Sequence, residues 1–251
     1  MPPITTIDDV INTLQEIIDD AITHESTFGY FAALYLKVTV KVKEGIAANF
    51  FDDGERMEKL DVIFATRYIE AYYNYKENKP VSASWEKAFN ATKTFWTTVL
   101  QHLLLGMNAH INLDLGIAAA QVCEGSSIES LENDFTKINI ILSSLVTEVE
   151  SDLSKVWPFL KKILKVTRKI DTFLIDFSMK LARDGAWKFA VELANTPQEN
   201  RTECIKQRDI NVAKKASIIT NPGIIPQLIF IVIRMGERGS VSQKTRDLMQ
   251  K

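Results

Sequence analysis

The sequence predicts an all-α protein, a single-domain bundle of about eight to ten helices with a buried polar helix at its centre. Only 10 glycines and 7 prolines occur in 251 residues, which favours long helices joined by short loops. The apolar fraction of 46% and the charged fraction of 25% are those of a globular protein, and they exclude a disordered chain, a collagen-like repeat and a disulfide scaffold. Apolar residues also recur at helical spacing through most of the chain.

Helical periodicity and end signals predict the elements of the first half. The first helix, over residues 6–21, carries two aspartates in its first turn, where they suit the positive end of the helix dipole. Residues 30–48 contain VTVKV, which alternates like a strand, but a longer apolar pattern follows helical spacing over four turns and predicts a helix. The run NFFDDG ends it, and a third helix follows over 55–76. Ser84 is the expected N-cap of a fourth helix, which starts near Trp85.

The second half continues as long helices between short polar segments. A break before residue 94 precedes a long helix that runs to about residue 122, and CEGSSIES follows it as a linker. Two helices are expected over 128–153 and 156–194, with Pro158 as a candidate break in the second. A helix over 204–219, the break NPG, an apolar helix and a charged tail complete the chain.

Charge, cysteine content and hydropathy exclude several classes of protein. The formal net charge of −2 argues against a nucleic-acid binder. Cys123 and Cys204 have no metal-ligand spacing and predict reduced thiols in the cytoplasm. The start MPPITTIDDV lacks the basic and apolar regions of a signal peptide. The longest apolar stretch, residues 223–235, includes Pro226 and Arg234 and is too short to span a bilayer, so we expect a buried or interfacial helix and no stable membrane insertion.

The segment HLLLGMNAHINLDLGIAAAQ, residues 102–121, is the candidate site. At about 100° per residue, His102, His110 and Asp114 share one face of a helix that is otherwise apolar all round. His110 and Asp114 are an i,i+4 pair, close enough to touch or to bind one ion together. Gly106 lies between the histidines and costs about 1 kcal/mol in a helix, so we expect a neighbouring helix or a ligand in the space it leaves. A helix this apolar is normally buried, and its polar groups then need partners.

Polar residues elsewhere are candidates for the same site. Asn108 and Asn112 form a second i,i+4 pair on another face of the central helix. Asp61 lies on the inward stripe of the helix over 55–76, where a leucine would be expected, with Arg67 at the margin of that stripe. A core-facing carboxylate needs a cation, either an arginine or a metal. Tyr68 belongs to a group of tyrosines that either complete the core or line a substrate site.

A late helix offers a second charged set. Asp176, Arg183 and Trp187 lie along one edge of it. Asp176 and Arg183 are expected to form a buried ion pair, and the alternative is that Arg183 binds an anionic group of a substrate. The sequence contains no GxGxxG, GxxxxGK[ST], HExxH, GxSxG or DDxxD motif, so none of these standard sites is predicted.

The strings RMEKLDVIFATRYIEAY, SWEKAFNA and VLQHLLLGMNAHINLDLGIAAA, with the later ARDGAWKFAVEL, resemble the uncharacterised, mainly bacterial domain-of-unknown-function family 5995. The resemblance covers about residues 31–193 and agrees with the prediction of one helical domain over 1–251, in which helices in 204–251 pack on the family-like core. It implies no established activity. The positions that it singles out are Asp53, Arg56, Asp61, Arg67, Tyr68, His102, Asn108, His110, Asn112, Asp114, Arg183 and Trp187.

A weaker similarity is to helical zinc-dependent phospholipases C and related nucleases. Gly106, His110 and Asp114 match their frame of Gly-x-x-x-His-x-x-x-Asp, but Ala118 stands where a further ligand is possible. Because the chain has three histidines in total, a three-zinc cluster is excluded and the resemblance implies at most a single divalent metal.

Three functions remain open. The first is an intracellular enzyme, a hydrolase, lyase or cyclase, that acts on a small, partly apolar molecule. Its catalytic residues would be His110, Asp114, His102 and Asp61, and its substrate-binding residues Arg67, Tyr68, Asn108, Asn112, Arg183 and Trp187. The second is a non-catalytic small-molecule-binding or interaction protein whose polar core only holds the bundle together. The third is a phosphoesterase with one metal on His110 and Asp114. The concentration of polar residues in one apolar core favours the first.

Overall fold

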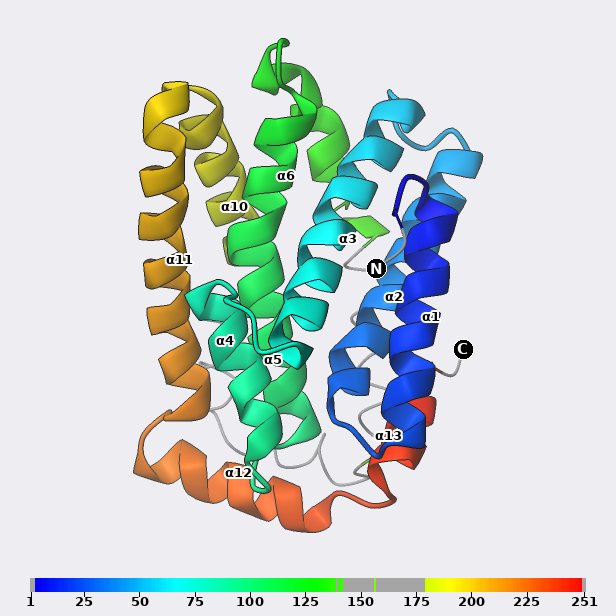
Figure 1. The fold of residues 1–251 in the computed structure, drawn as a ribbon, viewed down its shortest axis with the longest axis vertical. Helices are drawn as coiled ribbons and strands as arrows, with labels where there is room; N and C mark the ends of the chain where they lie inside the picture. The colour runs from blue at the N-terminus through cyan, green and yellow to red at the C-terminus, as the bar shows by residue number, and fades with distance from the viewer. Residues whose placement is uncertain (1–2, 139, 142–155, 157–178, 250–251) are drawn as a thin grey trace.

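The structure, a computed structural model, describes residues 3–138, 140–141, 156 and 179–249, and within them it is all-α (Figure 1). This part of the chain confirms the predicted fold class, with ten α-helices and no strand. The helices are α1 (Ile7–Thr23), α2 (Phe28–Ala47), α3 (Gly54–Lys76), α4 (Ala83–Asn90), α5 (Val99–Ala109), α6 (Leu115–Val122), α10 (Met179–Ala194), α11 (Gln198–Thr220), α12 (Ile224–Gly236) and α13 (Val241–Met249).

The central helix is α5 continued by α6, and the other helices pack around it. A π-helical turn, His110–Asp114, joins α5 to α6 without ending the helix. Helices α2, α4 and α11 pack on α5, while α3 and α10 pack on α6. The span Val99–Val122 is long and apolar enough to cross a membrane, and 94% of its apolar window is buried within the protein. The predicted buried central helix is therefore confirmed.

Capping side chains explain where the helices begin. Thr6 and Asp9 form a capping box at the start of α1, and Thr98 caps α5 in the same way with Gln101. The cap of α4 is Ser82, which accepts a hydrogen bond from the Trp85 amide, so the predicted cap two residues later is wrong. The segment VTVKV is helical inside α2, as the longer apolar pattern predicts.

The C-terminal part differs from the sequence prediction in two places. Helix α11 begins at Gln198, six residues earlier than predicted, directly after Pro197. The predicted charged tail is helix α13, which packs on α1 and α2. Thr245 of this helix is fully buried, which short-range apolar periodicity did not indicate. Half of the predicted helix 128–153 lies outside the described residues, as do Pro158 and Asp176.

Gly106 allows α2 to approach the central helix. A Cβ atom at Gly106 would lie 2.3 Å from Cδ2 of Phe31, so the space that this glycine leaves is filled by a ring from α2. Of the two occupants expected from the sequence, the structure shows the neighbouring helix. Because Phe31 is itself packed on all sides in the core, it has little freedom to move away.

We therefore expect Gly106→Ala to lower the free energy of unfolding by about 1–3 kcal/mol through overpacking. Gly185→Ala in α10 is the matched control, because a Cβ atom there meets only Nη2 of Arg208, at 3.6 Å. The control should be neutral or stabilising by up to about 1 kcal/mol, since alanine favours a helix interior over glycine. Urea unfolding of both variants measures the difference. Equal free energies of unfolding for the two variants would show that the Phe31 ring moves aside without loss of stability.

Candidate functional site

The candidate site is built on the π-helical turn between α5 and α6. All five residues of this turn, His110–Asp114, are buried. π-Helical turns are rare and occur frequently at functional sites. The turn holds the His110–Asp114 pair that the sequence singled out, at the level where α3, α10 and α11 surround the central helix.

Asp114 connects three helices through its carboxylate. Its Oδ1 atom accepts a hydrogen bond from Nε of Arg67 on α3, at 2.8 Å. Its Oδ2 atom accepts one from Nε1 of Trp85 on α4, also at 2.8 Å. The third partner is Nδ1 of His110, at 3.1 Å from Oδ2. Because a carboxylate only accepts hydrogen bonds, Nδ1 of His110 carries the hydrogen and Nε2 presents its lone pair.

Aromatic rings enclose the imidazole of His110. The ring of Phe64 stacks on it, with 3.6 Å between centroids, and the ring of Tyr35 meets it edge-on at 4.5 Å. Phe31, Tyr68 and Trp85 complete the enclosure, at centroid distances between 5.9 and 6.1 Å. Burial lowers the pKa of His110 and outweighs the opposing effect of the hydrogen bond that its Nδ1 donates to Asp114. His110 is therefore a neutral base at physiological pH.

Three buried polar atoms, one on the imidazole itself and two on the neighbouring helices α2 and α3, have no hydrogen-bond partner in the part of the chain that the structure describes. They are Nε2 of His110, Oη of Tyr35 and Oδ2 of Asp61. Buried polar groups are nearly always paired, so such a group needs an explanation. Asp61 lies one turn before Phe64 on α3, and its charge contributes to the raised pKa of Tyr35, which places Asp61 and Tyr35 close together.

Burial also changes the charge state of Asp61. Desolvation raises the pKa of this carboxyl to about 8, with a smaller contribution from Glu58. At neutral pH Asp61 is thus mainly protonated and can donate a hydrogen bond. Among the described residues, no arginine and no metal-binding group pairs with Oδ2 of Asp61. Protonation neutralises the carboxyl instead.

The structure brings Arg67 and Tyr68 to the His110 site but not His102. His102 lies two turns earlier, about 12 Å along the helix axis, where its ring contacts Tyr30 at 5.6 Å. Burial together with the charges of Arg234 and Lys244 lowers the pKa of His102 to about 3. His102 shares a helix face with His110 and yet belongs to a different environment.

Asn108 and Asn112 attach the central helix to α11. Nδ2 of Asn108 donates to the carbonyl of Val212, and Nδ2 of Asn112 donates to Oδ1 of Asn108. Nε of Arg208 donates to the carbonyl of Asn112 at 2.8 Å. Both asparagines are therefore used in packing, on a face of the helix away from His110.

Arg183 and Trp187 lie on α10. Trp187 packs against Phe135, with 4.9 Å between ring centroids, and no described contact joins it to His110. Arg183 is buried, and its Nε and Nη1 atoms have no hydrogen-bond partner within the described residues. Its expected partner Asp176 lies outside them.

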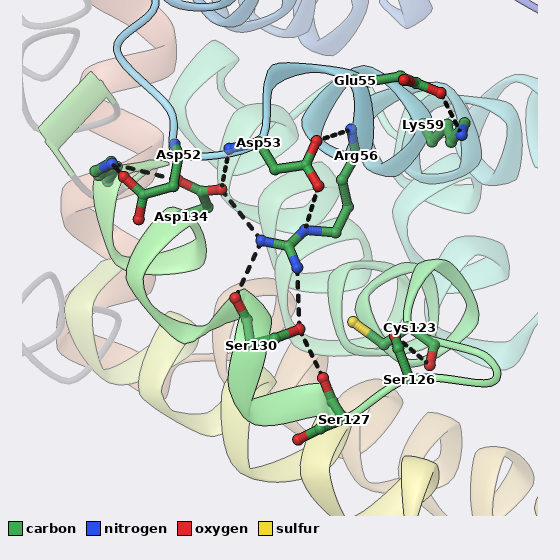
Figure 2. Close-up of polar contacts among 11 residues, drawn as sticks. Asp52, Asp53, Glu55, Arg56, Lys59, Cys123, Ser126, Ser127, Ser130 and Asp134 are labelled. Atoms are coloured by element: carbon green, nitrogen blue, oxygen red, sulfur yellow. Dashed lines mark hydrogen bonds and ion pairs between the residues drawn. The ribbon is translucent and has the colours of Figure 1, made fainter.

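A separate polar cluster orients the start of α3 (Figure 2). Asp134, fully buried, accepts hydrogen bonds from the amides of Asp52 and Asp53 and from Nη2 of Arg56. Arg56 also donates to the hydroxyl and the carbonyl of Ser130. Asp53 caps α3 by accepting from the Arg56 amide. Two positions that the family resemblance singled out, Asp53 and Arg56, thus hold the helix that carries Asp61 and Arg67.

The residues around Asp114 do not fit a metal ion. No group of three His, Cys, Asp or Glu side chains that could hold a metal occurs in the described residues. Both carboxylate oxygens of Asp114 already accept hydrogen bonds, and one of the donors is the cationic guanidinium of Arg67. A divalent ion would have to displace these donors and lie beside a positive charge.

Sequence reasoning missed Trp85, Tyr35 and Phe64. Trp85 comes from a different helix, and no spacing rule links it to Asp114. Tyr35 and its neighbours on α2 follow helical spacing. This spacing predicts that Tyr35 is in the core, but it does not reveal that the Tyr35 hydroxyl has no partner among the described residues. The sequence does place a tyrosine on the inward stripe of this helix. Because a buried tyrosine hydroxyl usually has a hydrogen-bond partner, such a position is a candidate for a polar site.

Comparison with known proteins identifies one family. A family model described as a family of unknown function (DUF5995) matches residues 7–222. This range extends on both sides beyond the resemblance found in the sequence. No curated protein and no solved structure matches the chain.

Proposed function

The chain belongs to the DUF5995 family, whose function is unknown, and from its site we propose that it is an intracellular enzyme with His110 as the general acid–base catalyst. The substrate is a small, partly apolar molecule, because the groups around His110 are mainly aromatic rings with a few polar tips. The reaction is that of a hydrolase, lyase or cyclase.

The state of His110 is the observation that carries this proposal. Its Nδ1 atom is held by Asp114, while Nε2 is buried and has no partner among the described residues. The same division occurs in catalytic triads, where a carboxylate orients the imidazole and the free nitrogen moves the proton. In a purely structural network we would expect Nε2 to be satisfied too.

Asp61 supplies the complementary acid in this proposal. Burial lowers the pKa of His110 and raises that of Asp61 to about 8, so at neutral pH the site holds an uncharged base and an uncharged acid. Titratable groups whose environments push their pKa values apart in this way typically share acid–base work. Within the range of reactions above, such a pair suits proton transfer between two atoms of one substrate, as in a lyase or a cyclase.

A non-catalytic role is the second candidate, and the bonding of Asp114 favours it. The Arg67, Trp85 and His110 hydrogen bonds join α3, α4 and the central helix, which is also what a structural network would do. The phosphoesterase hypothesis is not carried forward, because the donors around Asp114 do not fit a metal.

The two candidates differ in what His110→Asn changes. We expect the variant to stay folded, with a melting temperature equal to or above that of the wild type, since active-site polar groups are often held at a cost to stability. In mixtures of small metabolites followed by mass spectrometry, a compound consumed by the wild type should persist with His110→Asn. The control is His24→Asn, which changes a histidine whose side chain is 69% exposed.

A structural role gives the opposite pattern. Loss of a buried polar contact would destabilise His110→Asn by about 1–3 kcal/mol. That loss, combined with no compound consumed by the wild type alone, would contradict the enzyme proposal and leave the packing role.

A further inference from the structure

Helix α12 (Ile224–Gly236) leaves one apolar face uncovered. It runs across one end of the bundle, transverse to the long helices (Figure 1). Phe230 and Ile233 point inward and are 1% and 2% exposed. The opposite side carries five large apolar side chains that are 45% to 82% exposed: Ile224, Ile225, Leu228, Val232 and Met235. At about 100° per residue these five fall within one arc of about 100°.

Two exposed aromatic residues lie beside α12. Phe95 and Trp96, in the segment before α5, are 73% and 47% exposed. Arg234 of α12 holds that segment, because its Nε atom donates to the carbonyl of Phe95 at 2.7 Å and its guanidinium lies 4.8 Å from the Phe95 ring centroid. We call the five α12 residues with Phe95 and Trp96 the end surface. A row of exposed apolar side chains such as that on α12 marks an interaction site.

The two chain segments that carry the end surface contain basic residues and no acidic ones. No acidic residue occurs between Asp209 and Glu237, or between Glu86 and Asp114. Asp209 accepts from the amides of residues 83 and 84, and Glu237 is buried and paired with Arg234 and with residue 244. Within these two segments and directly after Glu237, the exposed charged residues are all basic: Lys87, Lys93, Lys214, Lys215 and Arg238. This holds although the whole chain has a net charge of −2.

We propose that the end surface binds the interface of a bilayer that contains anionic lipid. A helix with one apolar face and a basic border lies in the plane of such an interface. Trp and Phe side chains favour the level of the lipid headgroups, which is where Phe95 and Trp96 would lie beside α12. The binding is peripheral, since α12 has 13 residues and is about 20 Å long, shorter than the roughly 30 Å hydrocarbon core, and α11 is turned from it by 68° and packs on α4 and α5.

A second copy of the chain fits the end surface less well. The exposed strip is about 20 Å long and about 10 Å wide, the length and width of one helix. A stable protein interface buries about 800 Å² on each partner, so a second copy would have to cover the basic border as well as this strip. In a two-fold dimer the basic residues of one copy would lie opposite those of the other copy and repel them. The same basic residues attract an anionic lipid surface.

Sedimentation of the full-length protein with vesicles tests the proposal. We expect binding to phosphatidylcholine vesicles that contain phosphatidylserine, less binding to phosphatidylcholine alone, and weakening by added salt because salt screens the basic residues. Leu228→Glu places a charge in the centre of the apolar face and should reduce the bound fraction at least about tenfold. Thr202→Glu adds the same charge at an exposed position of α11 and should bind like the wild type.

Circular dichroism confirms that both variants remain folded, and Trp96→Ala gives a second, uncharged test with the same expected direction. Absence of vesicle binding by the wild type, or unchanged binding by a folded Leu228→Glu, would overturn the proposal. A wild-type dimer that Leu228→Glu converts to a monomer would overturn it too, in favour of a second copy at the end surface.

Discussion

Urea unfolding of the wild-type protein should give a free energy of unfolding that falls by about 1 kcal/mol in total as pH rises from 6.5 to 8. The cause is Asp61, whose pKa is raised from 3.8 to about 8 by burial. Between these values the folded chain holds one more proton than the unfolded chain, so stability decreases with pH. Asp61→Asn removes the titrating group and should remove this decrease.

The histidines set the lower limit of that pH window. Burial lowers the pKa of both His102 and His110 from 6.5, so each adds stability as pH rises through 6.5, and this gain offsets part of the Asp61 loss up to about pH 7.5. Below pH 6.5 their effect therefore opposes that of Asp61. Glu70→Gln, which changes an exposed carboxylate on the same helix, should keep the wild-type slope. A flat wild-type profile between pH 6.5 and 8 would contradict a buried, unpartnered Asp61.

Asp114→Ala should be the most damaging single substitution of the site. It leaves Nε of Arg67, Nε1 of Trp85 and Nδ1 of His110 without their common acceptor. Breaking a buried charged network from one side costs about 3–5 kcal/mol, and urea unfolding at constant pH measures it. Glu70→Ala, an exposed carboxylate on α3, should change stability by at most about 0.5 kcal/mol.

A double-mutant cycle separates the network from simple loss of volume. If Arg67→Ala and Asp114→Ala act through their shared hydrogen bond, the double variant should lose less stability than the two single losses added together. Strict additivity, or a loss below about 1 kcal/mol for Asp114→Ala, would mean that the carboxylate does not hold α3 to the central helix.

The fold was predictable because it follows from local periodicity. The segment VTVKV shows why a long pattern outweighs a short one, since α2 buries one apolar stripe over its whole length. The end of the chain was less predictable, because α13 is stabilised by contacts with α1 and α2 rather than by its own sequence pattern. Tertiary contacts of this kind have no local signal.

The site was predictable where it depends on one helix and unpredictable where helices meet. The His110–Asp114 pair follows from i,i+4 spacing, and Asp61 stands out as a carboxyl on an apolar stripe. Helical spacing also grouped His102 with His110, although the two lie about 12 Å apart along the axis and meet different neighbours. Trp85 reaches Asp114 only through the packing of α4, which no spacing in the sequence reveals.

The π-helical turn has a geometric consequence for the whole bundle. Such a turn contains about one residue more than an α-helical turn, so every side chain of α6 is rotated by about 100° from where a regular continuation of α5 would put it. The apolar faces of α5 and α6 therefore point in different directions although the helix is continuous, and α3 and α10 pack on the face of α6. Deleting a single residue from His110–Asp114 would turn α6 as a unit and carry Gly116 away from Phe189, whose ring now lies against that glycine. The one additional residue in the π-helical turn thus determines which side chains of α6 face α3 and α10.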